Sequence, residues 1–177
     1  RNDAGIFAER PQDLLELIVY WAEHQRIGTH AEMIAFNIER KLQETNLDRQ
    51  APPLPMTKAC KGVELLSAAV TFTKKSSIRL PDQSNDPERN LHALDPKKLL
   101  VSPDWDDQSI QTLISRALFD ESTYGRVRFH HRSVREYLTA RWISQLLERQ
   151  KPRRAVERLL FAGRYGLEVM LPSLKPI

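Results

Sequence analysis

Two adjacent histidines, His130 and His131, lie where a predicted strand gives way to a predicted helix, and they are the residues best placed to do chemistry. Polar and apolar residues alternate over 126–130, and apolar residues recur at helical spacing over 134–146. The first N–H groups of a helix have no intrahelical partner and bind anions such as phosphate. His131 is therefore a candidate phosphate ligand, whereas spacing alone favours the simpler role of helix capping.

Other polar residues surround this joint. Ser133 and Glu136 have the spacing of a capping box, in which each side chain accepts a hydrogen bond from a backbone N–H at the helix start. Arg132, Arg135 and His130 are further candidates for phosphate or interdomain contacts. For the two arginines, solvent exposure or pairing with acids is the simpler role.

Positive charge is concentrated in one part of the chain. Residues 124–166 hold eleven arginines or lysines and three acids, a net charge of +8, and the remaining residues bring the total to +4. Such a segment fits nucleic acid, a nucleotide phosphate or an acidic surface of the same protein. A solvated helix face is the simplest explanation for most of these arginines.

Several kinds of chemistry lack the residues they need. The six glycines form no phosphate-binding loop, and the five histidines and the single cysteine, Cys60, lack metal-ligand spacing. No serine stands in a nucleophile motif, and the acids Asp104, Asp106 and Asp107 suit a helix N-terminus. We therefore predict no catalytic residue, no metal and no enzymatic activity for these 177 residues.

Signals for membranes and secretion are also missing from the sequence. The longest apolar run, residues 14–22, is too short to cross a bilayer, and the first residues do not resemble a signal peptide. A single cysteine fits a reducing compartment. We expect a cytoplasmic protein without a membrane partner, and we interpret Arg1 as the first residue of a piece excised from a longer protein.

Periodicity and turn residues predict a mainly α fold in four parts. Residues 1–48 form a small helical domain, and the prolines of residues 49–56 mark a linker. Residues 57–150 form a winged-helix domain that ends in a long helix. Residues 151–177 begin a further helical region, with C-terminal helices that break near Gly163 or Gly166.

Two helices are expected in the first domain. Pro11 fits the first position of a helix over 11–24. The narrow polar stripe of this helix comprises Asp13, Glu16, Tyr20 and Glu23. Since the rest of its circumference is apolar, we expect the helix to be buried between neighbours. Thr29 and Glu32 form a second capping box, which opens a helix that ends near Thr45.

After the linker, the predicted elements follow the order of a winged helix. They are a helix over 57–73, a strand over 77–80, helices over 95–100 and 106–116, and a β-hairpin over 118–130. The helix over 106–116 would enter the major groove in the usual DNA-binding mode. It opens with Asp106 and Asp107 and carries one basic residue, Arg116, so the sequence disfavours DNA as a partner.

The run over residues 129–140, FHHRSVREYLTA, resembles the F-x-H-x-S-x-x-E-Y/F-L-x-A stretch of NACHT-type signal-transducing NTPases. These proteins belong to the STAND class, which includes NOD-like receptors and bacterial anti-phage sensors. Residues 10–14, RPQDL, resemble the proline-bearing start of the helical domain that follows their P-loop domain. The domain order also agrees, and the resemblance covers residues 6–165. The position before Glu136 is often glutamine in the family and is Arg135 here.

The resemblance implies a nucleotide-dependent switch. In that family the histidine of the winged helix contacts the β-phosphate of ADP, and the proline lies against the base; these positions correspond to His131 and Pro11. The resemblance further implies an upstream P-loop domain that binds ADP or ATP, a downstream sensor region, and homo-oligomers on activation. No nucleotide is expected on the isolated 177 residues, and His130 competes with His131 for the ligand-facing role.

Two other functions are compatible with the same sequence. One is a winged-helix adaptor that binds DNA or protein through the basic segment 124–166. The other is a structural connector without a ligand. A steep loss of binding with added salt would favour the adaptor.

Overall fold

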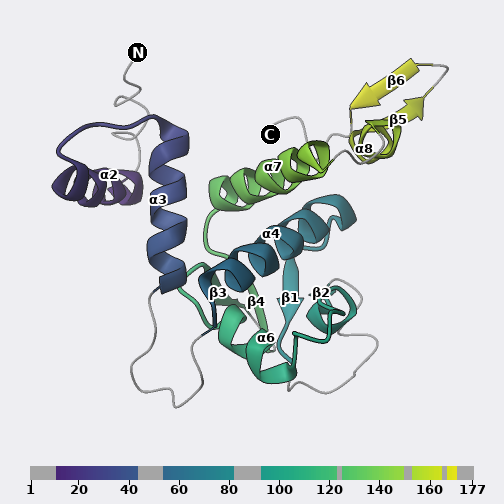
Figure 1. Cartoon of the computed structure of the whole chain (residues 1–177), viewed down its shortest axis with the longest axis horizontal. Coiled ribbons are helices and arrows are strands. Elements are labelled where there is room, and N and C mark those ends of the chain that lie inside the picture. The colour runs from purple at the N-terminus through teal and green to yellow at the C-terminus, as the bar shows by residue number, and fades with distance from the viewer. Residues whose placement is uncertain are drawn as a thin grey trace.

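The structure, a computed structural model, describes residues 11–43, 54–81, 93–122, 125–149, 153–164 and 167–170. These residues form a mainly helical protein with a four-stranded sheet and a separate two-stranded hairpin, which confirms the predicted mainly α class. Figure 1 shows helix α4 (Met56–Thr73) between helix α7 (Arg132–Glu148) and the four-stranded sheet.

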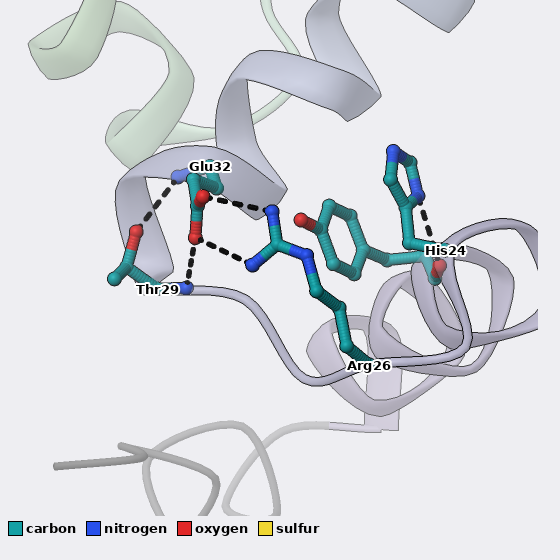
Figure 2. Close-up of polar contacts among 5 residues, drawn as sticks. His24, Arg26, Thr29 and Glu32 are labelled. Atoms are coloured by element: carbon teal, nitrogen blue, oxygen red, sulfur yellow. Dashed lines mark hydrogen bonds and ion pairs between the residues drawn. The ribbon is translucent and has the colours of Figure 1, made fainter.

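The first two helices form a pair joined by a short turn. Helix α2 spans Pro11–His24 and helix α3 spans His30–Gln43, close to the predicted bounds. The capping box before α3 is confirmed: Thr29 Oγ1 accepts from the N–H of Glu32 at 3.3 Å, and Glu32 Oε2 accepts from the N–H of Thr29 at 2.7 Å (Figure 2).

The same glutamate also ties the turn to α3. Arg26 Nη2 lies 2.9 Å from Glu32 Oε1, and Figure 2 shows the guanidinium reaching across the turn toward the carboxylate. The hydrogen bond from Arg26, together with those from Thr29, lowers the pKa of Glu32 to about 2. His24 Nδ1 lies 3.1 Å from the carbonyl oxygen of Tyr20, one turn earlier in α2.

The expected burial of α2 is wrong, because α2 leaves several large apolar residues exposed and packs on α3 through two residues of its polar stripe, Glu16 and Tyr20. Tyr20 is 2% exposed and clusters with Met33, while Glu16 accepts from Asn37 at 2.9 Å and from Lys41 at 3.2 Å. The polar groups of the stripe thus find partners on α3. The large apolar residues exposed on α2 are Leu14, Leu15, Ile18 and Trp21.

The middle of the chain builds the sheet. Strands β1 (Ser77–Arg79), β3 (Phe119–Ser122) and β4 (Arg126–Phe129) confirm the predicted short strand and hairpin. The sheet order is β2-β1-β4-β3, in which β2 (Ala93–Leu94) pairs parallel to β1 and was not predicted. The 3₁₀ helix η1 (Pro96–Lys98) and helix α6 (Asp107–Ile114) lie between β2 and β3.

One hydrophobic core joins α3, α4, α6, α7 and the sheet. Its fully buried members include Val63, Leu66, Ile78 and Leu113. α3 contributes Ile34, Ile38 and Leu42 to this core, although it also packs on α2 through its other side. At Gly62, a Cβ atom would lie 2.7 Å from side-chain atoms of Leu113 and Trp105, so glycine allows α4 to approach them closely.

The C-terminal segment differs from the prediction. Helix α8 covers only Arg153–Leu160, and strands β5 (Phe161–Arg164) and β6 (Leu167–Met170) pair antiparallel where further helix was expected. Each glycine inside a helix costs about 1 kcal/mol relative to alanine, so Gly163 disfavours the continued helix. Residues 1–10, 44–53, 82–92 and 171–177, with most of the predicted linker, lie outside the described residues.

Candidate functional site

The joint between β4 and α7 has the predicted form. β4 ends at Phe129, and α7 begins at Arg132 with His131 as its N-cap in an extended conformation, φ −130° and ψ 140°. The N–H of Arg135 donates to the carbonyl of His131 at 3.3 Å and is the first hydrogen bond of the helix. The backbone N–H groups before it lie at the positive end of a 17-residue helix.

The two histidines at the joint have different surroundings. His130 Nδ1 lies 2.8 Å from Asp120 Oδ1, and the His130 N–H donates to the carbonyl of Leu118 at 2.9 Å. Both contacts hold His130 against the other strand of the hairpin: Asp120 lies in β3, and Leu118 directly precedes it. The half-buried ring of His131 instead lies over the start of α7, with Nδ1 3.3 Å from Ser133 Oγ.

The capping box predicted at Ser133 and Glu136 is wrong. Ser133 is the second residue of α7 rather than its cap, and within the described chain no side chain caps this helix. Glu136 turns to Arg132, whose Nε lies 2.5 Å from Glu136 Oε1. The guanidinium one turn earlier is a stronger partner for the carboxylate than a neutral backbone N–H.

The electrostatic character of the joint favours an anion. The first turn of α7 contains no acid, and Arg132 is exposed there. Glu136 offsets part of this positive charge through its pair with Arg132. Arg135 is half-buried, and its carbonyl faces α4. Helix N-termini without acidic residues attract phosphates and carboxylates.

Pro11 and His131 are not brought together in one site. Pro11 is the first residue of α2, as predicted, but its ring lies outside the described side chains. α2 packs on α3, and α3 in turn packs on α7 (Figure 1). α3 therefore lies between the helices that carry the two candidates (Figure 1).

The helix expected to enter a DNA groove presents acids. Asp106 caps α6 by accepting from the N–H of Ser109 at 2.8 Å, as predicted, and Asp107 pairs with Lys97 at 2.6 Å. The one basic residue predicted for this helix, Arg116, is 5% exposed, and burial lowers the pKa of its guanidinium. These contacts disfavour phosphate binding by this face.

A buried polar seam between α4 and α7 was missed by the sequence analysis. It comprises Glu64, Ser67 and Thr71 of α4 and Thr139, Arg141 and Gln145 of α7. The available signal was a glutamate and two hydroxyls within the otherwise apolar run of α4.

Glu64 carries the charge of this seam. Its side chain is 2% exposed; Oε1 lies 2.9 Å from Arg141 Nε, at an angle unsuited to a hydrogen bond, and Oε2 accepts from Gln145 at 3.0 Å. Burial raises the pKa of this carboxyl, against the opposing effect of Arg141. Cys60, one turn earlier, is half-buried and packs against the core.

No protein-family model, curated protein or solved structure matches this chain. Across the described ranges, no group of three or more histidine, cysteine, aspartate or glutamate side chains could hold a metal ion. The helices that the structure describes also lack the combination of length and apolar character needed to cross a bilayer.

Proposed function

We propose that this chain is the regulatory helical and winged-helix region of a STAND-class, NACHT-like protein. In this proposal it closes over ADP or ATP bound by an upstream P-loop domain and relays the nucleotide state to a downstream sensor region. The observation that carries the proposal is His131, placed as the N-cap of a long helix whose first turn holds no acid. Signal transduction in bacterial anti-phage defence is the setting in which we place it.

The order of elements supports the winged-helix assignment. The elements follow in the order α4, β1, β2, η1, α6, β3 and β4, and β1, β4 and β3 are neighbours in an antiparallel arrangement, with β2 added parallel to β1. A helix-turn-helix followed by a two-stranded wing has this order. The acidic α6 supports a role of this module in contacts within the protein rather than on DNA.

The surroundings of the two histidines favour His131 as the phosphate ligand. His130 is engaged with Asp120, whose carboxylate would repel a phosphate at the same ring. His131 lies at the start of α7, beside the first backbone N–H groups of the helix, which have no partner within the helix and can donate to an anion. A histidine that donates to a phosphate links two domains through one ligand, so loss of that contact would shift the population toward an open state.

The test uses the natural full-length protein that contains these residues. We would purify it, denature it and quantify released ADP and ATP per chain for wild type, His131→Ala and His130→Ala. We expect nucleotide in wild type and in His130→Ala, and about tenfold weaker retention in His131→Ala, because a hydrogen bond to a charged group contributes about 1.5 kcal/mol or more.

The other outcomes decide among the alternatives. Equal retention in all three proteins would make His131 a helix cap only. Absence of nucleotide from wild type would overturn the switch, and salt-dependent DNA binding by the basic segment 124–166 would then be the next measurement.

A further inference from the structure

Buried hydroxyls hold the first turns of α7 against α4. Ser67 Oγ donates to the carbonyl of Arg135 at 2.5 Å and lies 2.8 Å from Thr139 Oγ1. Thr71 Oγ1 lies 3.1 Å from the same Thr139 oxygen, which also lies 2.8 Å from the Arg135 carbonyl. Ser67 and Thr139 are fully buried, so water cannot replace these partners.

Counting hydroxyl hydrogens shows which contacts can coexist. Three hydroxyls supply three hydrogens for four short oxygen–oxygen contacts. The Thr139 hydrogen can go either to the Arg135 carbonyl or to Ser67, and Thr71 can donate to Thr139 in both cases. Because a carbonyl only accepts, Ser67 donates to the Arg135 carbonyl in either arrangement, and it is the α4 residue that bonds directly to the backbone of α7.

This bond leads to the proposed ligand-binding residue in two steps. Ser67 holds the carbonyl of Arg135, and the N–H of Arg135 donates to the carbonyl of His131 at 3.3 Å. One buried hydroxyl, that of Ser67, thereby helps to fix the position of the α7 N-cap residue relative to α4. Thr71 contacts Thr139 Oγ1, one turn further along α7, and lies at the far end of this group of hydroxyls from the Arg135 carbonyl.

We propose that Ser67 is a positioning residue for His131: its hydroxyl holds the first turn of α7 on α4 and so sets where the His131 ring meets a bound phosphate. The proposal rests on the proposed function for its ligand and on the α4–α7 contact for its geometry. A ligand contact displaced by even a fraction of an ångström weakens sharply, since hydrogen bonds depend on distance and angle.

The first experiment is a double-mutant cycle in the natural full-length protein, with ADP affinity as the readout. Ser67→Ala is combined with His131→Ala, and Thr71→Val is the matched control that removes another buried hydroxyl of the same seam. We expect Ser67→Ala to weaken ADP binding about fivefold when His131 is present and to have no further effect when His131 is absent. Thr71→Val should leave ADP affinity within about twofold of wild type.

A second readout does not need the ligand. Amide hydrogen exchange at residue 135 of this chain should be about fivefold faster in Ser67→Ala and unchanged in Thr71→Val. Ser67→Cys fills the same space with a weak hydrogen-bond donor, so its exchange rate at residue 135 should lie between the rates of Ser67→Ala and Thr71→Val. This variant separates loss of the hydrogen bond from a folding defect caused by the lost volume.

The possible results separate the two proposals. If Ser67→Ala weakens ADP binding equally with and without His131, or not at all, the positioning role is overturned. If His131→Ala itself leaves ADP affinity unchanged, the proposed phosphate contact of His131 fails, and exchange at residue 135 alone then decides whether Ser67 positions this turn. Equal exchange in Ser67→Ala and Thr71→Val would overturn that role.

Discussion

The seam between α4 and α7 and the turn between α2 and α3 place polar side chains in opposite surroundings. In the seam, the Glu64 carboxyl is 2% exposed and Ser67 is fully buried. In the turn, the capping box and the Arg26–Glu32 pair lie at the surface, whereas the part-buried contact of Glu16 with Asn37 lies elsewhere along these two helices. Polar contacts in the seam and in the turn therefore contribute different energies.

The difference teaches that burial, more than partner identity, gives a polar contact its weight. An exposed ion pair contributes little because water and salt replace either partner, whereas a buried one strongly destabilises the protein when it is broken. We therefore expect substitutions in the α4–α7 seam to lower the free energy of unfolding more than matched substitutions in the α2–α3 turn do. Four measurements test or sharpen this expectation, given in order of decreasing effect.

Arg141→Ala should have the largest effect. It removes the guanidinium that lies 2.9 Å from Glu64 and leaves a buried carboxylate without its counter-charge. We expect the free energy of unfolding, measured by urea denaturation at pH 7, to fall by about 3 kcal/mol. The control, Arg153→Ala, removes an exposed pair with Glu157 and should change stability by less than about 0.5 kcal/mol. Equal effects would contradict the comparison.

Gly28→Ala should rank second and tests a close packing contact in the α2–α3 pair. A Cβ atom there would lie 2.7 Å from Tyr20 Oη, and Tyr20 is 2% exposed. The ring also stacks on His24 and meets the edge of Phe36, so it has little room to move. We expect a loss of about 2 kcal/mol by urea denaturation. A variant as stable as wild type would contradict this expectation and show that the Tyr20 ring can move aside at little cost.

The pH dependence of stability should report the buried carboxyl. Because burial raises the pKa of Glu64, the folded chain holds this proton more tightly than the unfolded chain does. Glu64 thus stabilises the fold most below its unfolded pKa, and this contribution is lost as the pH rises through the folded pKa. Lowering the pH from 7.5 toward 5 should raise the free energy of unfolding of wild type relative to that of Glu64→Gln. The change should be smaller than the loss expected for Arg141→Ala. Parallel curves for the two proteins would refute this.

Thr29→Ala should have the smallest effect. It removes one half of an exposed capping box, while Glu32 keeps its contact with Arg26. We expect a loss of about 0.5 kcal/mol by thermal or urea unfolding, at the low end for an N-cap. Thr29→Ser keeps the hydroxyl and should match wild type. A loss as large as that of Arg141→Ala would reverse the order of the two pairs.

Elements set by local signals could be predicted from the sequence. Pro11 begins α2, Thr29 precedes α3 and Asp106 caps α6, because each signal acts within one turn of the chain. The side of α2 that faces α3 could not be predicted, since Tyr20 and Glu16 belong to the polar stripe of the helix and their partners on α3 are not evident from the sequence. The β5–β6 hairpin was missed because two four-residue segments carry little periodicity.

The candidate site divides in the same way. The strand-to-helix joint and the N-cap position of His131 followed from local pattern. The capping box at Ser133 and Glu136 failed because Arg132 competes for the carboxylate. The seam of Glu64 and Ser67 could not be predicted, since their partners Gln145 and Thr139 are 81 and 72 positions away in sequence.

The length of α7 has a mechanical consequence. Its 17 residues span about 26 Å, and α4 holds it at Arg135, Thr139 and Gln145, over about 15 Å of that length. A helix held at three points over more than half its length cannot tilt about one of them without breaking contacts at the others. A displacement at His131 would therefore carry α4 with it, and the end of α7 that precedes α8 would move as part of the same rigid body.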